Sequence, residues 1–205
     1  MYETISIKKM IDNFAQLDAK KIKIFSDEDI KELRLQYLSY KRKWVNQFYN
    51  IFHAERIDIN PKSSVVSKYS NILSKSMNDG NRYSLTTYYF LRYLPGSFTT
   101  THRDNNESSN GFTSVTLIDE VNLKGGESLL FEAVKKPEEY NRQNIKGPKM
   151  WEFEDPWRVP VIIQDFKIGD TLIYNQNMKH GVAKVLSGER VVLIAWFKNE
   201  EVKND

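Results

Sequence analysis

The stretch KIGDTLIYNQNMKHGVAKVLSGERVVLIAWF, residues 167–197, decides the fold class. It contains three short runs of apolar and β-favouring residues: 171–174, 181–186 and 191–197. Gly169-Asp170 precedes the first run and Ser187-Gly188 lies between the last two, and such pairs supply the backbone angles of tight reversals. Short runs divided by turn residues predict antiparallel β-strands.

The same pattern extends back to residue 83. Further strands are predicted at Tyr83–Leu94, Phe112–Ile118, Ser128–Phe131 and Val161–Phe166. The pairs Pro95-Gly96 and Gly125-Gly126 provide additional turns. Seven or eight short strands favour a double-sheet jelly roll, or double-stranded β-helix, over residues 83–198.

Residues 1–80 have a helical pattern instead. Apolar residues recur at three- and four-residue steps from Ile7 to Leu17 and again from Ile30 to Phe52, where Ser26 with Asp29 can begin the second helix. A third helix is predicted around Val65–Leu73. We therefore expect one α+β domain over residues 1–205, with N-terminal helices packed on one sheet of the jelly roll.

Residues 135–160 interrupt the β pattern with four prolines and several aromatic residues. A connection this long is typical of a functional lid. Its aromatic residues could equally cover an exposed sheet edge. Both interpretations stay open.

Composition excludes several classes of function. The chain has 205 residues, a net charge of +3 and no cysteine, so disulfides, thiolate nucleophiles and cysteine-held metals are excluded. The start of the chain lacks a secretion signal and no segment is apolar enough to span a membrane, so we expect a cytoplasmic protein with no membrane partner. The nearly even charge balance disfavours a nucleic-acid partner.

Three residues could hold a metal ion. His102 and Asp104 are two residues apart, a spacing that directs side chains to one face of an extended segment, and His180 lies between two predicted strands. Two imidazoles and one carboxylate leave open positions on an octahedral ion, as in non-haem iron(II) oxygenases. The alternative is that His102 and Asp104 are ordinary turn residues.

Arg190 begins the last apolar strand. An arginine in such a run must pair or reach solvent, because burying an unpaired guanidinium is costly. It therefore either binds an anion or forms a surface salt bridge, for example with Glu189.

The ordered series of these motifs resembles the 2-oxoglutarate and iron(II)-dependent dioxygenases, and within them the prolyl 4-hydroxylase-like branch. The series is Tyr93-Leu94-Pro95-Gly96, His102-Arg103-Asp104, Gly125-Gly126-Glu127, Lys167 to Tyr174, His180-Gly181-Val182 and Ser187 to Leu193. It covers about Tyr83 to Lys198.

The resemblance implies a role for each matching residue. His102, Asp104 and His180 are the expected iron ligands, and Arg190 and Tyr93 the expected partners of 2-oxoglutarate. Some relatives carry a second tyrosine on the strand after the metal motif; this chain has Ile118 there, and Thr116 is the expected substitute. Arg103, Trp196 and the 135–160 excursion are candidate walls of the substrate pocket, whereas His53 matches nothing and is expected on the surface of the helical half.

The resemblance also implies the chemistry. Fe(II), 2-oxoglutarate and O2, with ascorbate as an accessory reductant, would hydroxylate a prolyl residue of a peptide or a small amino-acid-like substrate, with release of succinate and CO2. Asp104 favours hydroxylation, because related halogenases lack this carboxylate. Two alternatives stay open: an oxygenase acting on a small metabolite or nucleic acid, and a non-catalytic jelly-roll module that binds a metal or another ligand. The nucleic-acid case is weakened by Trp196, which stands where demethylating relatives have a further arginine.

Overall fold

The computed structural model of the chain describes residues 19–40, 45–48, 52–59, 64–77, 82–104, 111–131, 161–163 and 166–200. Within these ranges the protein is mainly β. The helices are α2 (Asp27–Ser39) and α3 (Ser64–Met77). The strands are β1 (Ala19–Lys23), β2 (Val45–Phe48), β3 (Phe52–Asp58), β4 (Tyr83–Tyr93), β5 (Phe98–His102), β6 (Phe112–Gly125), β7 (Ser128–Leu130), β8 (Val161–Ile163), β9 (Asp170–Asn175), β10 (His180–Val182) and β11 (Val185–Asn199).

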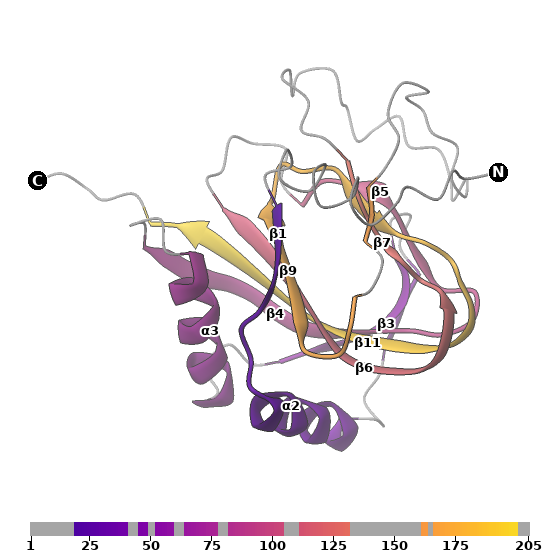
Figure 1. Cartoon of the computed structure of the whole chain (residues 1–205), viewed down its shortest axis with the longest axis horizontal. Coiled ribbons are helices and arrows are strands. Elements are labelled where there is room, and N and C mark those ends of the chain that lie inside the picture. The colour runs from indigo at the N-terminus through magenta and orange to yellow at the C-terminus, as the bar shows by residue number, and fades with distance from the viewer. Residues whose placement is uncertain are drawn as a thin grey trace, which may run out of the picture.

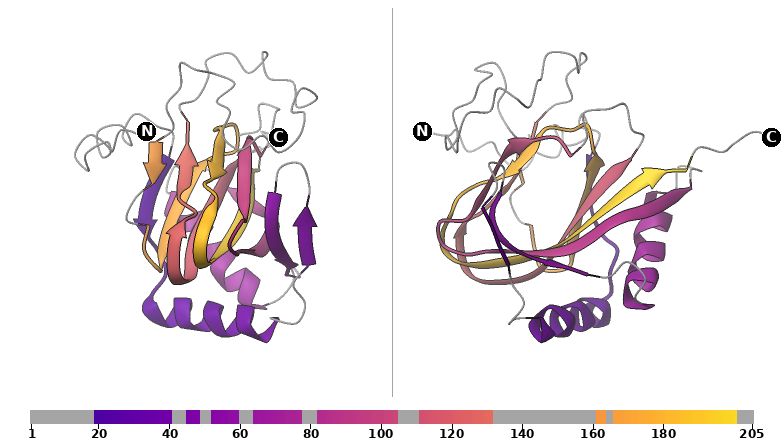
Figure 2. Two further views of the ribbon diagram at one scale, coloured as in Figure 1. Left: turned by 90° about the vertical axis from the view of Figure 1, so that its right-hand side faces the viewer. Right: turned by 180° about the vertical axis from the view of Figure 1, so that it is seen from behind.

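The strands form one antiparallel sheet in the order β1-β9-β6-β11-β4-β3-β5-β10-β7-β8, with β2 added beside β3. The sheet curls so that the arm containing β9 faces the arm containing β5 and β7 across the interior (Figure 1). The two further views show the same curl from the side and from behind (Figure 2). The mainly β architecture predicted from residues 83–198 is confirmed.

The long strand β11 shows how the sheet divides the interior from the helix-covered face. Because successive side chains point to opposite faces of a strand, Val192 and Ile194 belong to the apolar cluster inside the curl, while Leu193 and Phe197 belong to the cluster on the outer face. Full burial of each such side chain stabilises the fold by about 1.5–3 kcal/mol. Polar side chains on the inner face therefore do not disturb the packing of the outer core.

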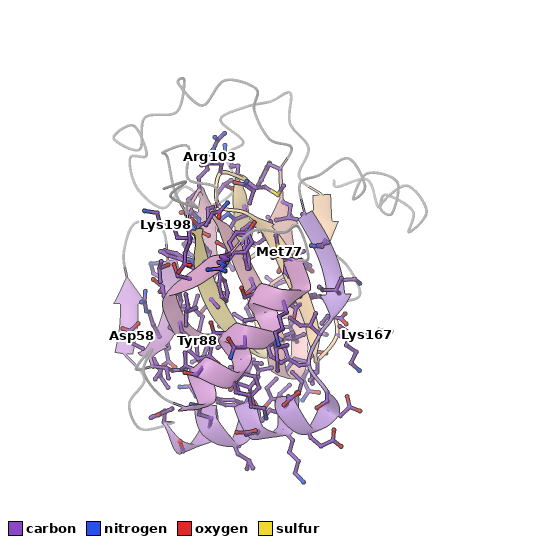
Figure 3. All side chains as sticks on the ribbon, turned by 90° about the vertical axis from the view of Figure 1, so that its left-hand side faces the viewer. Asp58, Met77, Tyr88, Arg103, Lys167 and Lys198 are labelled. Atoms are coloured by element: carbon purple, nitrogen blue, oxygen red, sulfur yellow. The ribbon has the colours of Figure 1, made fainter. Side chains whose placement is uncertain are left out.

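Helices α2 and α3 cover the outer face (Figure 3). Helix α2 begins with a capping box in which Ser26 and Asp29 satisfy each other's backbone amides, as the sequence predicts. Leu33 of α2 and Leu73 of α3 are fully buried in the outer cluster. Neither of these two described helices is long and apolar enough to span a bilayer.

The helical prediction for residues 30–52 is wrong beyond Ser39. Helix α2 ends there, and the chain continues into the hairpin β2–β3, which pairs with β4 and β5. The spacing of the apolar residues at positions 45, 48 and 52 indicates a helix, but cross-strand pairing overrides this local signal. His53 consequently lies on β3 with its ring stacked on Phe98 at 4.9 Å, not on a helix surface.

Ser187-Gly188 is also not the predicted reversal. Gly188 lies within β11 at a φ of 82°, where the register with β6 shifts. A Cβ atom at this position would lie 2.3 Å from the carbonyl oxygen of Val121, so only glycine fits the bulge. The predicted first helix and the 135–160 region lie outside the described residues. Of the predicted strand Val161–Phe166, the structure forms β8 over Val161–Ile163.

Candidate functional site

Strand pairing brings the two predicted histidine ligands together. His102 is the last residue of β5 and His180 the first residue of β10, and the two are direct partners in the antiparallel register. Asp104 lies two residues beyond the end of β5, where its backbone amide donates to the carbonyl oxygen of Gln176 at 3.1 Å. Asp104 thus faces the same side as His102, as the two-residue spacing predicts, although it lies beyond the end of β5.

The geometry of the three side chains suits one metal ion. Asp104 Oδ1 lies 3.4 Å from His102 Nε2 and 3.5 Å from His180 Nε2, and the three ligand atoms are all within 4.8 Å of one another. Ligands about 2.1 Å from one ion lie about 3.0–3.4 Å apart at octahedral or tetrahedral angles. The described residues therefore provide a three-ligand site that leaves other coordination positions open.

Backbone carbonyls orient both imidazoles. His102 Nδ1 lies 2.8 Å from the carbonyl oxygen of Thr100, and His180 Nδ1 lies 3.0 Å from that of Met178. A carbonyl oxygen can only accept, so in each ring the proton sits on Nδ1. Nε2 is left with its lone pair directed at the shared site, which is the tautomer that metal binding requires.

His102, Asp104 and His180, the trio, shift one another's pKa values. Burial alone raises the pKa of Asp104, but the imidazoles of His180 and His102 outweigh this and hold that pKa well below its usual range. Burial, with the neighbouring imidazole of His180, lowers the pKa of His102. Burial also opposes protonation of His180, but the carboxylate of Asp104 prevails and raises its pKa. The site therefore holds an ionised carboxylate beside the neutral imidazole of His102, and a bound dication would compete with protons for His180 Nε2.

Thr113 on β6 orients the carboxylate. Its hydroxyl donates to Asp104 Oδ2, and Oδ1 faces the two Nε2 atoms. Hydrogen bonds of this kind to a metal-binding carboxylate fix its orientation and raise metal affinity. The sequence analysis did not identify Thr113, although it points to the same face as Val115 in the alternation of β6.

Arg190 lies inside the protein, which excludes the surface salt bridge with Glu189. It is 2% exposed on β11 and donates to the carbonyl oxygen of Gly126 and, at 2.7 Å, to Ser128 Oγ. Its buried Nε has no hydrogen-bond partner among the residues that the structure describes. Burial lowers the pKa of Arg190, although nearby Tyr93 and more distant acidic groups counteract this. A buried guanidinium with neutral partners and a free donor is a site for an anion.

A single cavity joins the histidines to Arg190. Its empty volume is about 480 Å³ with its open mouth included. Its lining includes His102, Asp104 and His180 together with Tyr93, Arg190, Ser128, Tyr89, Tyr174 and Trp196, and otherwise consists mostly of aliphatic side chains. Tyr93 lies where the sequence predicts, with its hydroxyl 2.8 Å from Thr99 Oγ1 and its ring 5.9 Å from the Arg190 guanidinium carbon.

Two predicted pocket residues lie elsewhere. Thr116 is fully buried and its hydroxyl pairs with that of Thr171 at 2.9 Å, because the alternation of β6 turns Thr116 away from the cavity that Thr113 and Val115 line. Arg103 is buried at the end of the sheet opposite to α2 (Figure 3) and does not line the cavity. Trp196 does line it, as predicted.

The cavity also contains tyrosines that the sequence analysis missed. Tyr174 on β9 places its ring 4.6 Å from that of His180, and Tyr89 lies on β4. Burial, with the charge of Asp104, raises the pKa of both phenols well above the usual value, so both stay protonated. The strand alternation could have indicated this position. Tyr88, Phe90 and Ile173 belong to the outer cluster, so their neighbours Tyr89 and Tyr174 must point to the inner face.

Solved structures share this architecture. A Pseudomonas putida prolyl-4-hydroxylase matches with a TM-score of 0.62 and 15% identity over 93% of this chain and 97% of its own. The viral collagen prolyl hydroxylase of Paramecium bursaria Chlorella virus-1, in complex with 2-oxoglutarate, matches with a TM-score of 0.60 and 13% identity over 90% and 98%. HygX of Streptomyces hygroscopicus, with nickel, 2-oxoglutarate and hygromycin B bound, matches with a TM-score of 0.67 and 14% identity over 95% and 87%.

The chain has the fold of the prolyl 4-hydroxylases and related 2-oxoglutarate-dependent oxygenases. No protein-family model matches the sequence, and no curated protein does.

Proposed function

We propose that this protein is a 2-oxoglutarate- and Fe(II)-dependent oxygenase that hydroxylates its substrate. The convergence of His102, Asp104 and His180 at one end of a cavity, with the unsatisfied guanidinium of Arg190 in the same cavity, carries this proposal. When bound, iron(II) with 2-oxoglutarate supplies the oxygen activation needed for hydroxylation, with release of succinate and CO2. The likeness of the fold to solved 2-oxoglutarate oxygenases supports the same conclusion.

Each polar residue then has a defined task. His102, Asp104 and His180 hold the metal, and Thr113 keeps the carboxylate in the orientation that presents Oδ1. Arg190 binds the distal carboxylate of 2-oxoglutarate, because its planar fork suits a carboxylate and its Nε is free. Tyr93 stays a neutral phenol, since burial raises its pKa, and packs beside that guanidinium.

The substrate proposed is a prolyl residue of a peptide or a small amino-acid-like molecule. The named activities of two structural neighbours, a prolyl-4-hydroxylase and a collagen prolyl hydroxylase, support the prolyl class. HygX, whose structure contains hygromycin B, shows that this fold also accommodates a larger small molecule. Succinate release with free proline, other amino acids and proline-containing peptides would separate these classes.

The decisive test of the activity is anaerobic binding. Adding Fe(II) and 2-oxoglutarate to the protein should give a visible charge-transfer band that disappears in His180→Ala, because the variant removes one ligand. If wild type retains no iron and releases no succinate in air, the protein is instead a non-catalytic binding module.

A further inference from the structure

An aromatic corner forms one wall of the cavity. Tyr89 on β4 meets Trp196 on β11 edge to face, with ring centroids 6.3 Å apart. Both residues line the cavity, and Leu91 and Ile194 continue the wall on the same two strands. This part of the cavity therefore offers an apolar, π-rich surface close to the metal-binding trio.

The Tyr89 hydroxyl is a polar group on this wall without an internal partner. Tyr89 is only 2% exposed to solvent, and no group of the described residues makes a hydrogen bond with its hydroxyl. The proton stays on the phenol, because burial and the charge of Asp104 both raise its pKa. An unpaired phenol hydroxyl on a residue that lines a cavity can donate to a ligand or to water.

Arg56 on β3 lies over the ring of Tyr89. Its guanidinium carbon lies 3.8 Å from the ring centroid, and its Nε donates to Asp58 at 2.7 Å. Asp58 and Tyr89 are direct partners across β3 and β4. A cation over an aromatic face withdraws electron density and makes the phenol a stronger donor.

We propose that Tyr89 is a substrate-binding residue, whose ring forms an apolar seat with Trp196 and whose hydroxyl donates to an acceptor on the substrate. The substrate group so recognised is neutral and carries a carbonyl or similar acceptor next to a saturated carbon, as in a backbone amide. Arg56 acts through Tyr89 as a positioning residue. This inference rests on the proposed oxygenase function and adds to it which residues select the substrate.

The test uses two adjacent tyrosines of one strand. Tyr89→Phe removes the cavity hydroxyl, whereas Tyr88→Phe removes a hydroxyl that is buried without a partner against the helices. The probes are the N-acetyl amides of proline, leucine and valine, and free proline is the charged comparison. Binding is measured anaerobically, with Mn(II) and 2-oxoglutarate in the site, from the paramagnetic broadening of the probe's protons.

We expect Tyr89→Phe to weaken binding of the best capped amide about tenfold, the loss typical of one neutral hydrogen bond. Tyr88→Phe should bind like wild type. Arg56→Met should weaken binding about threefold, the size of an exposed cation–π contact, and Arg56→Lys should restore most of it. This rescue separates positioning through the ring from a merely structural role.

Two results overturn the inference while the proposed function stands. The first is Tyr89→Phe binding within twofold of wild type. The second is no binding of any capped amide by a protein that still forms the charge-transfer band with Fe(II) and 2-oxoglutarate. Absence of that band in wild type removes the proposed function, and this inference with it.

Discussion

Arg190 is a buried cation whose observed hydrogen-bond partners are neutral: a backbone carbonyl and a serine hydroxyl. Burying a charge in this way costs more free energy than such contacts return. The fold therefore holds Arg190 at the expense of its own stability, a pattern that is typical of binding sites.

Arg190→Met should separate the effect of Arg190 on stability from its effect on ligand binding. Without ligands, the free energy of unfolding should stay the same or rise by about 1 kcal/mol, because an apolar side chain of similar length replaces a poorly paired charge. The affinity for 2-oxoglutarate should fall about 100-fold or more, while metal affinity changes little. Urea unfolding and anaerobic titration measure the two effects. A stability loss above about 2 kcal/mol, or an equal loss of metal and 2-oxoglutarate binding, would show that the guanidinium is structural.

Thr113 provides a second test at this scale. Thr113→Val keeps the shape of the side chain but removes the hydrogen bond to Asp104, so metal affinity should fall about tenfold. The matched control is Thr116→Val, three residues along the same strand, whose hydroxyl pairs with Thr171 on the other face. The control should keep wild-type metal affinity in a Mn(II) titration. Equal losses in both variants would mean that β6 as a whole, and not the Asp104 contact, determines the affinity.

The three candidate metal ligands were predictable from the sequence, whereas the residues that support them were not. His102, Asp104 and His180 are distinctive residue types in an ordered series, and Arg190 stands out in an apolar strand. Thr113 and Tyr174 are common residue types in strands. They differ from Thr116 and Ile173 only in the face of the sheet to which their side chains point. A one-residue change of register exchanges the two faces, so function at these positions depends on pairing.

At the scale of elements, most strands after residue 83 were predicted because turn residues lie between them, but Ser187-Gly188 lies inside β11 and not at a turn. Strands β1 and β5 and the hairpin β2–β3 were missed, since short amphipathic segments become strands only when a neighbour offers its edge. Helices α2 and α3 were found from their apolar spacing, and the cap at Ser26 fixed where α2 starts. Local signals thus specify the ends of elements better than they specify pairing.

The packing of α2 gives a prediction with an internal control. Leu33 is fully buried against the sheet and Leu35, two residues along the helix, is 61% exposed. Leu33→Ala should lower the free energy of unfolding by about 2–5 kcal/mol, since it leaves a cavity in the outer core. Leu35→Ala changes helix propensity equally and should stay within about 0.5 kcal/mol of wild type in urea unfolding. Similar losses in both would show that helix propensity, and not packing on the sheet, sets the contribution of α2.

In the whole molecule, the two faces of one sheet serve different purposes: the outer face packs on the helices and the inner face lines the cavity. The outer cluster is apolar and joins the sheet to the helices, whereas the inner cluster surrounds the polar residues of the cavity. The polar trio and Arg190 thus lie among strands that the outer core holds in place. Ligands of the cavity should therefore stabilise the entire fold, because β5, β10, β11 and β4 all contribute to the site.

This coupling predicts a thermal shift. Mn(II) with 2-oxoglutarate, each at about 100 times its Kd, should stabilise the protein by about 2.7 kcal/mol or more, if both bind only the folded state. For a chain of this size that corresponds to a rise in Tm of about 5–10 °C, and a chelator should reverse it. His180→Ala should show little rise at the same concentrations, because it lacks one ligand of the trio. A variant that responds as strongly as wild type would mean that the metal binds outside the cavity, so that the ligand-linked stability comes from another surface. A wild-type Tm that does not change with both ligands would mean that neither ligand binds the folded protein. In either case the assignment of the three side chains as a metal site would be wrong.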